Sequence, residues 1–486
     1  MLIAPTHEIR TAEQTLFAAG TLSSAELMDR VIDRLWQAWI GEPLTAQLHP
    51  QRVVVYAGKG NNAGDALGLA ARFRCPVTLR SVCGVEELSP DSRRELLRIT
   101  APLDTEQPTP QSGLLILDGL LGSGAKGELR ADYAELVREM NKLREQSPRS
   151  LLLAIDVPTG LNADNGRSGA HVVQADITAA IGCVKPGMLT DGAEDAVGRL
   201  LCIPLPEVEL QPCSPAQVLS PGCTLPRLPR RPYSHFKNRA GHVGIIAGSK
   251  GMTGAARLCA AAAVAAGAGL VTLYCPEDIY PILAACVTPE VMVRPLPPAL
   301  MLMAQPMQAW VIGPGLGRQN RPEAENLQEF TNRVNCPVVL DADALNTAAE
   351  RGWSFRRNHI LTPHPGEMRR LDARPSARRQ DTVKRFLADN DCTLLLKGAR
   401  SIIADREQMF YNVSGGPYMA NGGQGDVLAG VIGALAAQGL RPIQAAALAA
   451  HACGKAAESA WAQSGYPPAI RAQQVIERLP EVLSPC

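Results

Sequence analysis

The sequence predicts an α/β protein of two doubly wound, three-layer domains, and three features of the chain lead to this expectation. The chain has 486 residues, more than one hydrophobic core usually organises. Short apolar runs that end in polar turns alternate with helical stretches, and continuous apolar runs are typical of strands buried on both faces of a parallel sheet. Eight prolines between Pro204 and Pro232 exclude a long helix or an interior strand there, which predicts a linker and two domains, 1–215 and 216–486.

The expected strands occur in order along both halves of the chain. In the first half they are the runs at 52–58, 114–120, 151–160 and 176–182. In the second half they are the runs at 242–249, 270–275, 310–317, 337–345, 359–367, 393–399 and 401–404. The alanine-rich segment 255–270 is expected to be a tightly packed interior helix, because it is too short to span a bilayer. Since open parallel sheets bind ligands beyond the carboxyl ends of their strands, the polar turns at these ends are the places to look for chemistry.

Composition narrows the function classes. Lysine and arginine number 48 against 47 aspartates and glutamates, so neither nucleic acid nor an anionic membrane is an expected partner. The thirteen cysteines form no Cys-x-x-Cys pair, which favours free, mostly buried thiols in a reducing cytosol. The N-terminal segment has an early Glu8 and no apolar stretch typical of a signal peptide. We therefore expect a soluble, cytoplasmic protein.

The first half carries a glycine-rich turn and two strand-end carboxylates. The turn 58–65, GKGNNAGD, follows an apolar run and precedes a helical stretch, as phosphate-binding loops do, although a purely structural turn fits it too. Asp118 and Asp156 each close a run, and a single such residue is often only a helix cap or turn former. Together with the Asn61-Asn62 pair they indicate an oxygen-rich site for a hard cation or for general acid and base chemistry.

These motifs resemble a known family. GKGNNAGD, DGLLGSGAKGELR, AIDVPTGLNADNG and AAIGCVKPGMLTDGAEDAVGRL resemble, in this order, the NAD(P)H-hydrate epimerase or YjeF N-terminal domain over about residues 5–205. The resemblance implies a Rossmann-like fold, a potassium ion held by Asn62, Asp118 and Thr159, and Asp156 as the proton carrier facing the nicotinamide ring. It also implies that the hydrated cofactor is cradled by Asn61, Asn62, Ala63, Gly64, Asp65, Gly122, Ser123, Gly124, Ala125, Lys126, Gly127 and Glu128.

Two alanines depart from this family's pattern. Ala63 and Ala66 stand where the family usually has glycine in NNGGDG. A Cβ at a position that needs a positive φ costs about 1 kcal/mol or more. We therefore expect these alanines to narrow the pocket and to make epimerase activity less secure than the fold.

The second half has a glycine-rich loop, 415–426, that runs directly into a helical stretch at 427–439. Glycines before a helix free N–H groups for an anion, and the helix dipole strengthens the field. Asp426 then lies beside the developing charge, although an aspartate in a first helical turn is commonly only a dipole partner. Further polar strand-end turns occur at 341–346, 362–367 and 397–399. Neither a P-loop nor a protein-kinase glycine loop is present.

The second half also resembles a known family. FKNRAGHVGIIAGSKGMTGAARL, VIGPGLG, VVLDADALN, LTPHPGEM, LLKGARSIIA and MANGGQGDVLAGVIGAL resemble the ADP- or ATP-dependent NAD(P)H-hydrate dehydratase, the YjeF C-terminal domain, over about residues 225–480. This implies a ribokinase-like fold and a catalytic Asp426. The implied contacts to the hydrated cofactor are Ala255, Gly317, His364 and Asp426. The implied contacts to the nucleotide are Lys397, Gly398, Ala399, Arg400, Ser401 and Gly425. Tyr418, Asn421 and Gln424 depart from the family's usual residues.

The two resemblances together imply a bifunctional repair enzyme. It would interconvert the R and S epimers of NADHX and NADPHX, and would dehydrate the S epimer at the expense of ADP, or of ATP, with AMP and phosphate released from ADP. A potassium ion in the first half and a homo-oligomer are expected, and Mg²⁺ in the second half is compatible with this hypothesis. Three alternatives stay open: a ribokinase-type small-molecule kinase, a Rossmann dehydrogenase in the first half, and a non-enzymatic nucleotide-binding scaffold.

Overall fold

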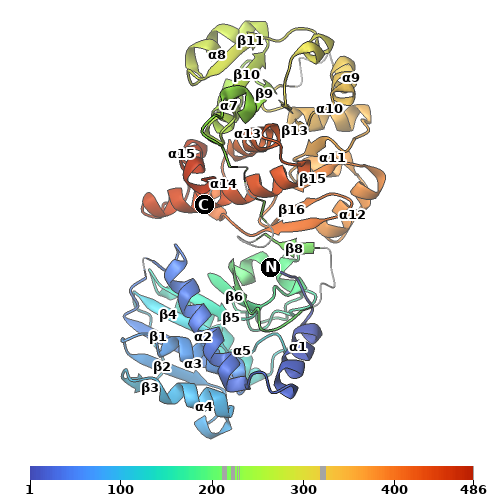
Figure 1. Cartoon of the computed structure of the whole chain (residues 1–486). Coiled ribbons are helices and arrows are strands. Elements are labelled where there is room, and N and C mark those ends of the chain that lie inside the picture. Colours follow the sequence, from blue (N-terminus) through green and yellow to red (C-terminus); the bar gives the residue numbers. More distant parts are fainter. Residues whose placement is uncertain are drawn as a thin grey trace. The chain divides into compact units, whose positions relative to one another are not determined.

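The computed structural model describes residues 1–46, 48–210, 216–219, 225–226, 228, 230–317 and 324–484. They form two compact units, Met1–Val218 and Leu219–Cys486 (Figure 1). The division falls inside the proline-rich segment, and several of the prolines that predicted the linker lie outside the described residues.

The first unit is built on a parallel sheet with the order β3-β2-β1-β4-β5-β6-β7. The order reverses direction between β1 and β4, and such a switch point opens a crevice beyond the strand ends. The strands are β1 Arg52–Ala57, β2 Val77–Ser81, β3 Leu103–Asp104, β4 Leu114–Gly119, β5 Leu151–Ile155, β6 Ile177–Gly182 and β7 Arg199–Pro204. The helices are α1 Thr6–Ala18, α2 Ser24–Gly41, α3 Asn61–Ala70, α4 Pro90–Leu97, α5 Ala131–Gln146 and α6 Glu194–Val197.

Both faces of this sheet are covered because its central strands are apolar on both faces. Val53 and Val55 of β1 belong to one core cluster, which includes residues of α2 and α3. Val54 and Tyr56 belong to another cluster, which includes residues of α5. Successive side chains of a strand point to opposite faces, so the continuous apolar run becomes the middle layer of three. The predicted strands at 52–58, 114–120, 151–160 and 176–182 are confirmed, with shorter bounds.

The second unit has the strand order β11-β10-β9-β12-β13-β14-β15-β16-β17. Its strands are β9 His242–Ile246, β10 Leu270–Cys275, β11 Val291–Pro295, β12 Ala309–Ile312, β13 Val338–Leu340, β14 His359–Leu361, β15 Thr393–Leu396, β16 Ser401–Ala404 and β17 Met409–Asn412. Its helices are α7 Thr253–Ala265, α8 Tyr280–Cys286, α9 Ala324–Arg333, α10 Asp343–Arg351, α11 Pro365–Leu371, α12 Arg379–Asp389, α13 Gln424–Ala437, α14 Pro442–Gln463 and α15 Ala472–Val482. A short strand, β8 Ala216–Val218, lies where the first unit ends.

The expectation of wholly parallel sheets is wrong at one edge of the second unit. β15 and β16 pair antiparallel, as do β16 and β17. Only residues 397–400 separate β15 from β16, which is enough for a hairpin but too short for the crossover that parallel pairing requires. The turn of this hairpin therefore lies at the carboxyl end of β15, beside the ends of the parallel strands.

The helix that follows the glycine-rich loop is held by close packing against α7. Gly430 of α13 lies so near the carbonyl oxygen of Cys259 that an added Cβ would collide with it. α7 is rich in alanine, and Ala256, Ala260 and Ala263 are fully buried. This confirms the expected interior helix, and small residues on both helices allow their backbones to approach closely. None of the helices in the described part of the chain combines the length and hydropathy of a membrane-spanning segment.

Candidate functional sites

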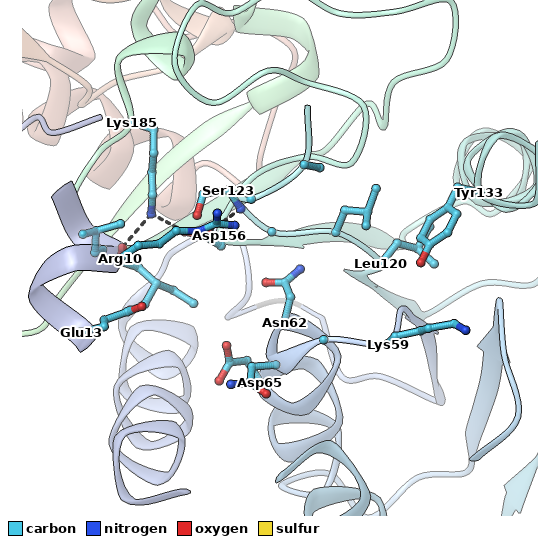
Figure 2. Close-up of a pocket in the computed structure, with 18 residues that line it drawn as sticks. Arg10, Glu13, Lys59, Asn62, Asp65, Leu120, Ser123, Tyr133, Asp156 and Lys185 are labelled. Atoms are coloured by element: carbon cyan, nitrogen blue, oxygen red, sulfur yellow. Dashed lines mark hydrogen bonds and ion pairs between the residues drawn. The ribbon is translucent and has the colours of Figure 1, made fainter. Parts of the chain in front are cut away.

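A cavity of about 670 Å³ opens at the switch point of the first unit (Figure 2). It lies beyond the carboxyl ends of β1, β4, β5 and β6, and α1 supplies a further wall. Its lining consists of Ile9, Arg10, Glu13, Lys59, Gly60, Asn61, Asn62, Asp65, Leu120, Leu121, Gly122, Ser123, Gly124, Ala125, Tyr133, Asp156, Ile181 and Lys185.

An ion pair between Asp156 and Lys185 forms one wall of this cavity. The Lys185 ammonium donates to Asp156 Oδ1 and, at 2.8 Å, to the carbonyl oxygen of Ile181. Asp156 Oδ2 accepts from the backbone N–H of Ser123 at 2.9 Å. Burial alone would raise the pKa of Asp156, but the Lys185 charge and these hydrogen bonds lower it below the ordinary value. Asp156 is therefore a carboxylate at neutral pH and can accept a proton.

The backbone at Asp156 is strained. Its φ is +66°, a left-handed conformation that costs a non-glycine residue roughly 1–2 kcal/mol. The strained turn directs the carboxylate into the cavity lining. Lys185 is a residue that the sequence analysis missed. Its signal was its place three residues after Gly182, at the end of the strand that neighbours β5.

Two further carboxyl groups line the cavity. Burial, with added repulsion from Asp156 and Glu13, raises the pKa of Asp65 well above its ordinary value. Burial also raises the pKa of Glu13, the Asp156 charge adds to the rise, and Lys185 and Arg10 partly offset it. The cavity therefore holds carboxyl groups of opposite tendencies, with Asp156 favouring the ionised form and the other two favouring the protonated form.

Asp118 and Thr159 lie together at the base of the same loops. Asp118 accepts from the Thr159 hydroxyl at 2.7 Å and from its backbone N–H at 2.8 Å. Burial raises the pKa of Asp118 to about 6, although hydrogen bonds from Thr159 and Leu120 act in the opposite direction. The side-chain nitrogen of Asn62 is buried without a hydrogen-bond partner among the described residues. Asp118 and Thr159 bring a buried carboxylate and a hydroxyl oxygen together, and such oxygens are ligands that fit a hard monovalent cation.

The expectation for Ala63 and Ala66 is wrong. Both residues lie inside α3, which begins at Asn61, and neither has a positive φ. Both are fully buried, and neither lines the cavity. The motif is the first turns of a helix instead of an extended glycine loop, so alanine causes no backbone strain and does not narrow the pocket.

The other residues predicted to cradle the substrate divide into two groups. Asn61, Asn62, Asp65 and Gly122–Ala125 line the cavity, whereas Ala63, Gly64, Lys126, Gly127 and Glu128 do not. Lys126 is exposed and lies 3.8 Å from Asp164. Glu128 packs beside Gly169. The predicted contact of residues 126–128 with the substrate therefore stays a prediction.

The second candidate site lies around Lys397, at the hairpin turn after β15. Lys397 donates to Asp341 Oδ1 at 2.9 Å, and the same oxygen accepts from the Thr362 hydroxyl at 2.7 Å. Lys397 Nζ is 3.4 Å from the position that a Cβ would take on Gly425 and 4.0 Å from Glu367. Burial would lower the pKa of Lys397, but Asp341 and Glu367 raise it above its ordinary value. Lys397 is therefore a cation held beneath the glycine-rich loop.

His364 adjoins this cluster through Glu367. It begins α11, where its Nδ1 accepts from the N–H groups of Gly366 at 2.9 Å and Glu367 at 3.3 Å. Its Nε2 lies 3.5 Å from Glu367. An imidazole whose Nδ1 accepts hydrogen bonds carries its proton on Nε2. His364 is half-exposed, so Nε2 can donate to a ligand.

Asp426 lies in the first turn of α13, directly after the glycine-rich loop. Burial raises its pKa to about 6, repulsion from Asp341 adds to the rise, and Lys397 offsets part of it. Gly423, with a φ of +94°, supplies the left-handed turn that starts the helix. Residues predicted from three separate segments, namely His364, Lys397 and the pair Gly425-Asp426, are thus brought together at one end of the sheet.

The residues that depart from the family's pattern support this loop. Tyr418 stacks on Trp461, with ring centroids 4.5 Å apart. The side chain of Asn421 donates to the carbonyl oxygen of Ile470 at 2.5 Å, and Gln424 donates to Asn421 at 3.1 Å. The glycine-rich loop is therefore fixed to the segment between α14 and α15.

The remaining predicted residues lie at the start of α7 and in the turns after β12 and β15. Ala255 packs against Gly315, and Gly317, with a φ of +76°, donates its N–H to Asp343 at 2.8 Å. In the hairpin turn, Gly398 and Ala399 are exposed while Arg400 is buried. The Ser401 hydroxyl donates to the Gly398 carbonyl at 3.2 Å. The Arg379 guanidinium lies against Gly398, and the sequence analysis did not single it out.

The fold and the two sites define a two-unit α/β enzyme, Rossmann-like in the first unit and ribokinase-like in the second. A family model described as NAD(P)H-hydrate dehydratase matches residues 243–481, and one described as YjeF-related protein N-terminus matches residues 23–187. The chain belongs to the family of bifunctional NAD(P)H-hydrate repair enzymes, as the sequence analysis predicted.

Relatives support this assignment over almost the whole chain. The bifunctional NAD(P)H-hydrate repair enzyme Nnr of Moorella thermoacetica is 34% identical over 477 residues, which cover 90% of this chain and 88% of the relative. The enzyme of the same name from Coxiella burnetii is 34% identical, with 94% of each chain covered. A solved ribokinase-like superfamily protein of Enterococcus faecalis is 25% identical and has a TM-score of 0.51, covering 57% of this chain and 98% of its own.

Proposed function

We propose that the first unit epimerises hydrated NADH and NADPH and that the second unit dehydrates the S epimer with ADP or ATP as phosphoryl donor. The observation that carries the proposal is the grouping of Asp426, Gly425 and Lys397 at one strand-end site. A phosphoryl-transfer site needs a base for the attacking hydroxyl, free N–H groups and a cation for the transferred group. This cluster contains all three.

In the dehydratase step, Asp426 takes the proton of the hydroxyl on the nicotinamide ring. The hydroxyl oxygen attacks the terminal phosphorus of the nucleotide, and the bond from that phosphorus to the bridging oxygen breaks. ADP is thereby converted to AMP. The phosphate ester then departs as inorganic phosphate, while the ring nitrogen lone pair and loss of a proton restore the dihydropyridine. The N–H groups of the loop around Gly425 stabilise charge on the transferred group. Mg²⁺, where present, would add further charge neutralisation.

In the epimerase step, Asp156 is the proton carrier beside the reacting carbon. The Lys185 ion pair keeps it ionised, and the strained turn holds it in the cavity lining. Asn62, Asp118 and Thr159 would hold a potassium ion, which would supply a fixed positive charge near the bound cofactor. Asp118 is suited to this because it is fully buried and one of its oxygens lies 2.7 Å from the Thr159 hydroxyl.

A mixture of both NADHX epimers tests the two activities together. Purified protein given ADP, and separately ATP, should convert the whole mixture to NADH, measured by recovery of NADH absorbance. Consumption of the S epimer alone would contradict the epimerase assignment. Net transfer of phosphate to a stable alcohol, without recovery of NADH, would favour the small-molecule kinase. We expect ADP to be the preferred donor.

A cytoplasmic location and homo-oligomeric assembly complete the proposal. The cysteines in the described part of the chain all carry free thiols, and none of them is exposed. Such thiols suit a reducing compartment.

A further inference from the structure

Arg10 projects from α1 into the lining of the first cavity, and Figure 2 shows its side chain extending toward Ser123. Its guanidinium lies so close to Gly124 that an added Cβ there would collide with Nη2. The glycine at position 124 thus leaves the space that the guanidinium fills. Arg10 and the loop 122–125 therefore form adjoining parts of the same wall.

The segment that carries Arg10 is fixed to the other side of the site. The N–H of Ala4 donates to Val184 at 3.1 Å, and the N–H of Val184 donates to Leu2 at 3.1 Å. Thr6 donates from both its N–H and its hydroxyl to Asp164, at 2.8 and 2.9 Å. Ile9 is buried against Gly182. α1 therefore holds Arg10 in place without a ligand, so little ordering of the backbone is needed on binding.

Arg10 differs from the other two cations that line the cavity. Lys185 pairs with Asp156, and Lys59 pairs with Glu87. Among the described residues, no carboxylate lies within ion-pair distance of Arg10. Arg10 is also exposed to solvent, so its N–H donors are free to meet an anion that enters the cavity.

We propose that Arg10 binds the phosphate on the nicotinamide half of the substrate and so selects phosphorylated nicotinamide hydrates over the riboside. This rests on the proposed epimerase function. Gly124 is next to Ser123, whose N–H holds Asp156, so Arg10 lies near the end of the cavity where the ring reacts. Only one ribose separates that ring from its phosphate. A planar guanidinium matches phosphate geometry with two parallel hydrogen bonds.

The proposal is tested by measuring the kinetics of the unaltered protein and of an Arg10 variant, each with two truncated substrates. The substrates are the hydrate of reduced nicotinamide mononucleotide, which has one phosphate, and the hydrate of reduced nicotinamide riboside, which has none. With Arg10→Gln we expect KM for the mononucleotide hydrate to rise about 10- to 100-fold, the range of a charge-assisted hydrogen bond. We expect kcat to stay within about twofold and the riboside hydrate to be unaffected, because the contact acts equally on ground and transition states.

Controls separate this contact from folding and from the epimerase assignment. Arg10→Lys should restore part of the affinity, and Arg93→Gln, on the exposed face of α4, should change neither substrate. Equal losses with both substrates, or no loss with either, would overturn the proposal. If the unaltered protein epimerises neither substrate, the epimerase assignment fails instead. Calorimetric binding of nicotinamide mononucleotide to the unaltered protein and to Arg10→Gln then still decides the role of Arg10, because equal affinities would overturn it.

Discussion

Lys397 and Asp341 form an ion pair of 2.9 Å directly beside Gly425. A nucleotide phosphate that reaches this loop therefore meets a cation already shared with a carboxylate that is only 2% exposed. Asp341 positions Lys397, and Lys397 in turn offsets the repulsion between Asp341 and Asp426. The charges of Asp341, Lys397 and Asp426 therefore act on one another.

Removing Lys397 should destabilise the second unit. Lys397→Met leaves Asp341 buried without its cation, and breaking a buried pair costs about 3–5 kcal/mol. Because Lys397 is partly exposed, we expect a loss near the lower end of this range in urea unfolding. The double variant Lys397→Met, Asp341→Asn should recover most of the loss. If it is no more stable than the single variant, the pair is not the source of the effect.

The dehydratase should gain activity as pH rises through about 6. Burial and Asp341 raise the pKa of Asp426 to about 6, and a general base acts only when ionised. We expect kcat/KM for the S epimer, which reports the pKa values of the free enzyme, to increase from about pH 5 to about pH 7 and then level off. Asp426→Asn should abolish this activity at every pH. A profile that is flat across this range would contradict the assigned base.

The same shift predicts a stability effect of opposite sign. The folded pKa of Asp426 lies above its ordinary value, so the folded protein binds the proton more tightly and loses stability as pH rises from about 4 to about 6. A shift of about two units corresponds to at most about 3 kcal/mol, and partial exposure reduces this to about 1–2 kcal/mol. Asp426→Asn should therefore be more stable than the unaltered protein at pH 8 but not at pH 4, as measured by thermal unfolding.

Substitutions at Asp156 and Lys185 should change the stability of the first unit and its epimerase activity independently. Asp156→Asn should slow consumption of the R epimer while sparing the S epimer. It should also destabilise the first unit by about 3–5 kcal/mol, because Lys185 is 1% exposed and loses its counter-charge. The double variant Asp156→Asn, Lys185→Met should regain stability without regaining activity. Equal loss of both epimers in Asp156→Asn would contradict the division of labour between the units.

Potassium should stabilise the first unit through Asp118. An ion that binds only the folded state raises the unfolding temperature, and we expect a rise of about 2–4 °C in potassium chloride relative to choline chloride at equal ionic strength. The effect should be larger at pH 8 than at pH 5, since Asp118, with a pKa of about 6, must ionise to hold the ion. Asp118→Asn should remove the difference. An unchanged difference in that variant would locate the ion elsewhere.

The sequence predicted the strand ends well because each buried strand is a continuous apolar run with a polar turn after it. Asp118, Asp156 and Lys397 were found in this way, and Asp426 was found from the glycine-rich loop before a helical stretch. The sequence did not predict five short strands, in which polar or partly exposed residues interrupt the apolar signal, namely β2, β3, β7, β11 and β17. The antiparallel direction of β16 was also not predicted, because it depends on the shortness of the connection 397–400 between β15 and β16.

Two site features depend on tertiary contacts that no local pattern contains. Arg10 and Glu13 reach the cavity because α1 packs against residues almost two hundred positions away, through Val184 and Gly182. The error at Ala63 arose from assuming that a glycine position needs a positive φ, whereas α3 begins two residues earlier. The resemblance identified the family, whereas the fold distinguishes the residues that face the cavity from those that support it.

The left-handed backbone of Asp156 has an evolutionary consequence. At that position glycine would relieve the torsional penalty, yet it would leave Lys185 buried without an anion and would remove the proposed base from the cavity. A mutant library sorted only for soluble expression should therefore tolerate paired exchanges at 156 and 185 that a library sorted for growth under cofactor damage rejects. The positions whose tolerated substitutions differ between the two libraries would identify the catalytic centre without any knowledge of the ligand.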